Sequence, residues 1–193
     1  MNNPLISKRP LSQHEKIRKI VLGAFFVAIA LFLGISKIGF IPLPLPIGAA
    51  QFFHIPIILA GIFVGPEIGL LCGIVFGFFA ILTYGSQFPW FVLFPARPFI
   101  GLISFYIFFG MLRFKNILLA SVLAAICGSL TNSVGVMGLA VFFRIFGPTL
   151  QANMAVVYSA MPVILIEAIL AAILVPLIVI PLKSFLPEIH SKS

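Results

Sequence analysis

Two polar residues in a strongly apolar sequence, Arg97 and Asn132, have the chemistry that a binding site needs. Arg97 lies in the segment Phe94-Pro-Ala-Arg-Pro-Phe-Ile-Gly101, between Pro95 and Pro98. A guanidinium group can bind a carboxylate through two parallel hydrogen bonds, and the start of a helix at this point would add partial positive charge. The alternative role is an arginine that extends to the lipid headgroups. We expect an anionic or carboxamide-rich ligand.

Asn132 lies in a run of polar residues, with Ser129, Thr131 and Ser133 beside it. A single asparagine inside a membrane often forms an interhelical hydrogen bond worth about 0.6–2 kcal/mol. The run is denser than such a bond requires. We therefore expect Asn132 to contact the ligand, with interhelical hydrogen bonding as the alternative.

Further candidates are expected near the same face of the bundle. These candidate substrate-binding residues are Gln51, His54, Tyr84, Trp90 and Tyr158. Tyr84 and Trp90 also fit an aromatic belt at the membrane surface. Glu167 lies near the middle of the last apolar run, and an acid at that depth usually faces the bundle interior. Because no second intramembrane acid is available, we expect a structural or substrate contact there, with a proton relay as the alternative.

The composition defines the elements that must position these residues. The chain has 193 residues, of which 62% are hydrophobic and 8% are charged. Soluble domains contain about 25% charged residues, so a soluble domain is excluded, and disorder is excluded as well. With roughly 20 residues per membrane span, the sequence predicts an all-α polytopic membrane protein of six transmembrane helices. We expect one membrane domain over 1–193, with a basic tail at 1–19, a bundle at 20–182 and a tail at 183–193.

The apolar runs place the six spans along the chain. We expect spans at 20–36, at 95–112, at 116–143 and at 155–182, and a short second and a full third span within 52–82, divided at Gly65-Pro66-Glu67. Prolines at 42, 44 and 46 exclude a helix from 38–48. That loop is expected to pack over the protein and to act as a gate. Pro162 and Pro176 are expected to kink the last span.

The distribution of charge predicts the orientation in the membrane. The net charge is +8, from twelve Lys and Arg against four Asp and Glu. Six spans place nine cations on the side of both termini and only three, Lys37, Arg97 and Arg144, on the other. Cytoplasmic loops are enriched in cations, so both termini are predicted to be cytoplasmic. The positive charge is thereby explained without nucleic acid.

Catalysis and metal binding are not indicated by the remaining residues. Cys72 and Cys127 are isolated in apolar runs, and the three histidines and four acids are scattered. A site for acid–base or metal chemistry needs such groups close together. We expect no enzyme activity, no catalytic residue, no metal and no cofactor.

Small residues recur at helical spacing in two places. Gly69, Gly73 and Gly77 form a ridge on the predicted third span, where we expect internal packing. Ala24 and Ala28 form a second ridge on the first span.

Taken together, these features resemble the substrate-binding membrane subunit, or S component, of an energy-coupling factor (ECF) vitamin transporter. The resemblance covers nearly the whole chain, and two segments, 54–66 and 95–101, are similar to the pantothenate, pyridoxine and folate branch. It implies that Ala24 and Ala28 dock a transmembrane coupling subunit, and that two soluble ATPases drive import. The chain has no Gly-Lys-Ser/Thr phosphate-binding loop of its own. The resemblance also implies a multi-pass protein of a bacterial-type plasma membrane.

Among the vitamins, the residues favour pantothenate. Arg97 suits its carboxylate, and Asn132 suits its amide or hydroxyl groups. Pyridoxine is neutral and does not require Arg97, whereas folate has two carboxylates and would need more cations. Pyridoxine or another B vitamin stays an alternative substrate, and a stand-alone ion-coupled permease stays an alternative function.

Overall fold

The computed structural model describes residues 13–38, 40–42 and 49–186. The described part is helical except for two short strands. The elements, in chain order, are α1 (Gln13–Ser36), β1 (Phe40–Pro42), β2 (Ala49–Gln51), α2 (His54–Val64), α3 (Pro66–Tyr84), α4 (Trp90–Leu93), α5 (Phe99–Met111), the 3₁₀ turn η1 (Leu112–Phe114), α6 (Ile117–Phe142), α7 (Leu150–Val179) and the 3₁₀ turn η2 (Lys183–Phe185).

Within the described residues, four helices are long and apolar enough to cross a membrane, namely α1, α3, α6 and α7. Two shorter apolar helices, α2 and α5, accompany them. The order of these elements follows the apolar runs of the sequence. Three helix starts differ from our expectation: α1 begins at Gln13 and not at Ile20, α5 begins at Phe99 and not at Pro95, and α7 begins at Leu150 and not at Ala155. The residues before the apolar runs extend α1 by about two turns and α7 by about one and a half turns.

A tight turn separates α2 from α3, as the sequence predicts. Gly65 has a φ of 124°, which a residue with a side chain rarely adopts. Pro66 follows as the first residue of α3, where its missing N–H costs nothing. The turn leaves α2 only 11 residues long, so α2 is about 16 Å in length, roughly half the thickness of a bilayer core.

The proline-rich segment is flanked by a small antiparallel ladder. Phe40 pairs with Gln51, and Pro42 pairs with Ala49. Residues 43–48, which include most of the predicted loop, lie outside the described part of the chain. The ladder places Gln51 directly before α2.

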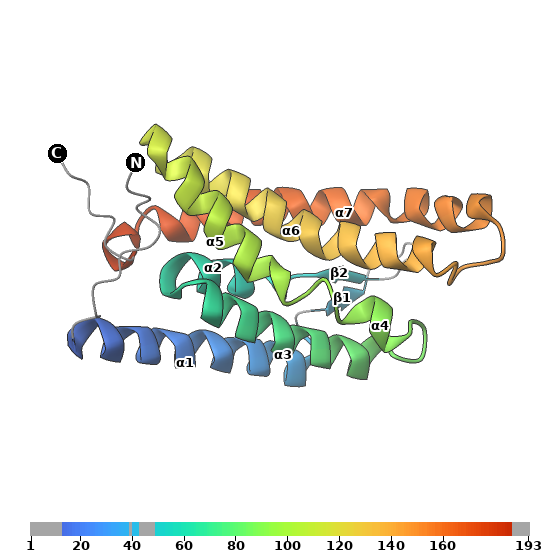
Figure 1. Cartoon of the computed structure of the whole chain (residues 1–193), viewed down its shortest axis with the longest axis horizontal. Helices are drawn as coiled ribbons and strands as arrows, with labels where there is room; N and C mark the ends of the chain where they lie inside the picture. Colours follow the sequence, from blue (N-terminus) through green and yellow to red (C-terminus); the bar gives the residue numbers. More distant parts are fainter. Residues whose placement is uncertain (1–12, 39, 43–48, 187–193) are drawn as a thin grey trace.

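The helices form a bundle in which α2 is central (Figure 1). In the view of Figure 1, α1 and α3 form one side, and α5, α6 and α7 form the other. The short helix α2 packs against both sides through α3 and α5, and its side chains are almost all buried. The start of α1 and the end of α7 lie at the same end of the bundle.

Glycines allow α2, α3 and α5 to meet closely. A Cβ atom added to Gly69 would lie 2.9 Å from the Cα of Gly101 and 3.0 Å from the Cα of Gly61. Carbon atoms do not approach so closely without displacement, so a side chain at Gly69 would push the helices apart. The predicted role of the glycine ridge in internal packing is confirmed at this position.

Candidate functional site

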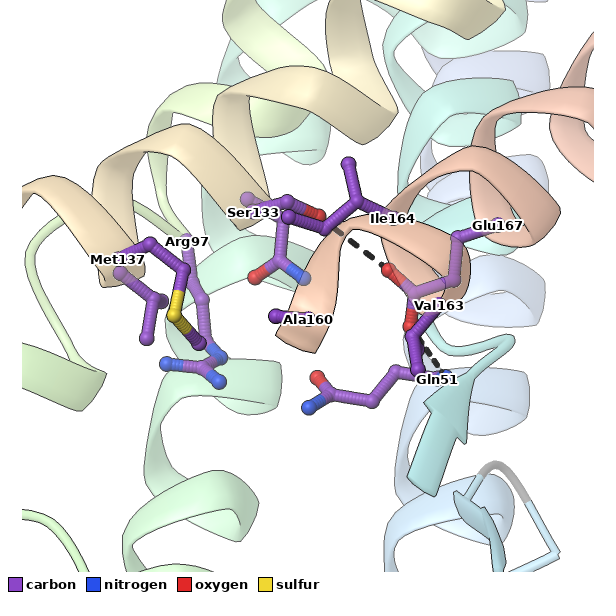
Figure 2. A pocket seen from close by; sticks show the side chains of 10 residues that line it. Gln51, Arg97, Ser133, Met137, Ala160, Val163, Ile164 and Glu167 are labelled. Atoms are coloured by element: carbon purple, nitrogen blue, oxygen red, sulfur yellow. Dashed lines mark hydrogen bonds between the residues drawn. The ribbon is translucent and has the colours of Figure 1, made fainter. Parts of the chain in front are cut away.

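Five polar and five apolar residues line a pocket near β2. The pocket lies between the end of β2, the turn before α5, and the facing sides of α6 and α7, and it contains about 390 Å³ of empty space, part of which is open to the surroundings. Its lining residues are Gln51, Arg97, Asn132, Ser133, Val136, Met137, Ala160, Val163, Ile164 and Glu167. Figure 2 shows Arg97 and Glu167 on opposite sides of this space, with the side chain of Gln51 between them.

Arg97 is the largest fully buried side chain of the described residues, with an exposed fraction of 1%. It lies in the turn between α4 and α5, and not in the first turn of the helix as we expected, because α5 begins only at Phe99. Its guanidinium carbon lies 4.7 Å from the ring centroid of Phe76 on α3, a cation–π contact. Its Nε and Nη1 atoms make no hydrogen bond within the described residues.

A glycine on α3 makes room for the backbone of this turn. A Cβ atom added to Gly73 would lie 2.7 Å from the Cα of Pro98 and 2.9 Å from the carbonyl carbon of Arg97. The turn therefore packs directly on α3, and this contact fixes where the guanidinium enters the pocket.

Two amide side chains add unpaired atoms to the same pocket. Oδ1 of Asn132 and Oε1 of Gln51 are buried and have no hydrogen-bond partner within the described residues. A buried polar group without a partner costs about 1–3 kcal/mol. A ligand that accepts hydrogen bonds from Arg97 and donates them to the two amides would remove this cost.

Glu167 connects three elements around the pocket. Its Oε1 accepts a 2.6 Å hydrogen bond from the backbone N–H of Gln51, and its Oε2 accepts a 3.2 Å hydrogen bond from the hydroxyl of Ser133 (Figure 2). The carboxyl group thus ties α7 to β2 and to α6. Both oxygens have protein donors.

The structure brings together three of the seven predicted substrate-binding residues, Arg97, Asn132 and Gln51. His54 is buried at the start of α2 but does not line the pocket. Tyr84, at the end of α3, is close enough to Arg97 for an electrostatic interaction, yet it is not a lining residue either.

Trp90 and Tyr158 point elsewhere. Their exposed fractions are 64% and 65%. On an ideal helix at 100° per residue, Tyr158 lies 180° from Glu167, so it faces away from the pocket. Trp90 packs edge-to-face against Phe91 on the surface of α4.

Sequence reasoning did not select several residues that line the pocket. Glu167 and Ser133 line the pocket but are not among the seven predicted substrate-binding residues. Ala160, Val163, Ile164 and Glu167 recur at helical spacing, which is a detectable signal for one face of α7. Because α7 is apolar on all sides, this pattern does not by itself distinguish the pocket face from the lipid face.

The two alanines of the predicted docking ridge lie on the surface. Ala24 and Ala28 are both exposed on α1. Their neighbours on this face are large exposed apolar side chains, among them Val21 and Phe32. Among the described residues, no three histidine, cysteine or acidic side chains lie together in a way that could hold a metal.

A pocket inside a helical membrane protein, lined by a few convergent polar groups, is a candidate site for a small molecule. Residues 18–179 match the family "ECF transporter, substrate-specific component", and the chain belongs to this family. It is a substrate-binding transport subunit and a multi-pass membrane protein, and it is not an enzyme. Family membership implies association with the membrane and ATPase subunits of an ECF transporter. No curated protein sequence matches the chain.

Proposed function

We propose that this chain is the high-affinity pantothenate-binding subunit of an ATP-driven ECF importer. The observation that supports the proposal is the set of unpaired atoms in the pocket: two donors on Arg97 and one acceptor each on Asn132 and Gln51. Pantothenate has a carboxylate that suits Arg97, and hydroxyl and amide donors that suit the two amide oxygens.

The alternatives fit these atoms less well. Pyridoxine has no carboxylate and would leave the buried guanidinium of Arg97 without an anionic partner. An ion-coupled permease needs an intramembrane group that is free to bind the coupling ion. Within the described helices, Glu167 is the acidic residue near the middle of a membrane-spanning helix. Both of its carboxyl oxygens already accept hydrogen bonds from the protein.

The proposed topology has six membrane passes within one membrane domain, 1–193, and both termini in the cytoplasm. The start of α1 and the end of α7 lie at one end of the bundle (Figure 1), which an even number of passes requires. The short helices α2 and α5 are the second and fourth passes, and the β1–β2 ladder extends the pass that contains α2.

The proposed docking face for the transmembrane coupling subunit is the surface of α1 around Ala24 and Ala28. Small side chains allow a second helix to approach closely in a membrane, and both alanines are exposed. This face is separate from the pocket, so ligand binding and docking can be altered independently.

The substrate is tested by identifying the small molecule that copurifies with the protein, followed by titration of ligand-free protein with pantothenate, pyridoxine and folate. We expect copurified pantothenate and a sub-micromolar dissociation constant for it. Tight binding of pyridoxine without pantothenate binding would identify the other substrate. Uptake into vesicles that contain this chain without ATPases, abolished by a protonophore, would identify a permease.

A further inference from the structure

A second cavity lies away from the polar pocket, at the end of the bundle where α1 begins and α7 ends. It is a groove of about 810 Å³ that is open to the surroundings, and every residue that lines it is apolar. The lining residues are Leu22, Phe25, Phe26, Ile29, Leu59, Phe63, Ile178, Leu182 and Phe185.

The short helix α2 explains why this groove exists. Because α2 ends at Val64, it does not fill the space between α1 and the end of α7. Leu59 and Phe63 of α2 form the floor, and the exposed side chains of Phe25, Leu182 and Phe185 form the rim.

A cation lies at one end of the groove. The guanidinium carbon of Arg18 lies 5.8 Å from the ring centroid of Phe185. Its Nη2 atom is buried and has no hydrogen-bond partner within the described residues. Lys183 is exposed two residues before Phe185. The nearby Lys19 is already paired with Glu67 at 2.7 Å.

We propose that this groove binds an anionic phospholipid, with an acyl chain between α1, α2 and α7 and the headgroup phosphate at Arg18. An apolar groove beside a half-buried guanidinium, one nitrogen of which is buried without a hydrogen-bond partner, is complementary to a molecule with an apolar chain and a negatively charged head. Both α1 and α7 are candidate membrane spans, so the groove opens where acyl chains are present.

The groove lies on a different face of α1 from the proposed docking ridge. At 100° per residue, Leu22, Phe25, Phe26 and Ile29 lie within about 100° of arc. Ala24 and Ala28 lie about 150° and about 110° from the centre of this arc. The lipid site therefore does not depend on the substrate or on the docking face proposed above.

The test is native mass spectrometry of the full chain with phosphatidylglycerol or phosphatidylcholine of identical acyl chains. We expect the first phosphatidylglycerol molecule to bind about tenfold more tightly than the first phosphatidylcholine molecule. This difference corresponds to about 1.4 kcal/mol of binding free energy. Arg18→Gln should remove this preference, whereas Lys16→Gln, on the exposed side of the same helix, should preserve it.

A second pair of variants tests whether the lipid occupies the groove. Leu182→Trp fills the groove and should weaken binding of both lipids, whereas Leu177→Trp, on an exposed site of α7 outside the groove, should not. Thermal unfolding of each variant checks that the fold is intact. Equal binding of the two lipids to the wild type, or unchanged binding to both Arg18→Gln and Leu182→Trp, would overturn the proposal. It would also be overturned if no lipid bound and Leu182→Trp alone prevented assembly with the coupling subunit, because the groove would then hold a protein partner.

Discussion

The backbone N–H of Gln51 donates a hydrogen bond of 2.6 Å to the carboxyl group of Glu167, 116 residues further along the chain. This contact joins the end of β2 to the middle of α7 at the rim of the pocket. The same carboxyl group accepts the hydroxyl of Ser133 on α6. One side chain therefore holds the strand, and with it the start of α2, against the helices that form the pocket.

Replacement of Glu167 should loosen this junction. Glu167→Ala leaves the Gln51 N–H and the Ser133 hydroxyl without their acceptor, and we expect a loss of about 1–3 kcal/mol in stability together with faster ligand dissociation. Glu167→Gln keeps one oxygen that can accept the hydrogen bond from Gln51, so it should lose less stability than Glu167→Ala. Thermal unfolding and stopped-flow dissociation measure the two effects. Glu67→Gln, at an acid with 76% exposure, should change stability by less than about 0.5 kcal/mol. Wild-type stability of Glu167→Ala would contradict the assigned role.

Replacement of Arg97 tests its proposed contact with the pantothenate carboxylate. Arg97→Gln would remove a charge-assisted pair worth about 1.5–3 kcal/mol, so we expect pantothenate affinity to fall by about 10–150-fold. Arg97→Lys keeps the charge but cannot form two parallel hydrogen bonds. Its affinity for pantothenate should therefore lie between that of the wild type and that of Arg97→Gln. Calorimetric titration is the measurement.

An analogue of pantothenate with an alcohol in place of the carboxylate separates this contact from a general loss of fold. The wild type should bind the analogue weakly, and Arg97→Gln should bind it equally well. Arg144→Gln, at an exposed cation, is the matched control and should keep full affinity for pantothenate. If Arg97→Gln weakened both ligands by the same factor, Arg97 would not contact the carboxylate.

The helices of the fold could be predicted from the sequence because long apolar runs without charge have few alternatives in a bilayer. The Gly65-Pro66 turn was predictable for a local reason, since glycine allows the positive φ and proline can begin a helix. The β1–β2 ladder could not be predicted from the sequence. Its pairing joins residues on both sides of a proline-rich segment, and the two short strands have no periodic pattern of apolar residues.

The candidate site was predictable only in part. Arg97 and Asn132 are conspicuous because polar groups are rare in this chain, and the structure brings them to one pocket. Tyr158 was selected for its side chain and its depth, but depth does not give direction. Direction depends on how α7 is rotated, and an evenly apolar helix contains little information on its rotation. Glu167 could not be assigned its partner from the sequence for a different reason. The donor is the backbone N–H of Gln51, and the residue type does not indicate which backbone group forms a hydrogen bond.

Gly73 should control the position of Arg97 without touching the ligand. Gly73→Ala places a methyl group against the Arg97–Pro98 backbone, so we expect a loss of about 1–3 kcal/mol from overpacking and weaker pantothenate binding. Gly138→Ala is the matched control, because nothing lies within 4 Å of its added Cβ. It should be neutral, or more stable by up to about 1 kcal/mol from helix propensity. Thermal unfolding and titration distinguish the two. Equal behaviour of both variants would show that the α3 contact does not position the turn.

Bulky residues at Ala24 or Ala28 should block docking and preserve ligand binding. Tryptophan at either position fills the space that a closely approaching helix of the coupling subunit would use, whereas the pocket lies on other helices. We expect normal pantothenate affinity in Ala24→Trp and Ala28→Trp, and loss of copurification with the coupling subunit and the ATPases. Ile173→Trp, at an exposed apolar site on α7, adds the same side chain to the lipid-facing surface and should assemble normally. Complexes that form as well with Ala24→Trp and Ala28→Trp as with Ile173→Trp would place the docking surface elsewhere on the bundle.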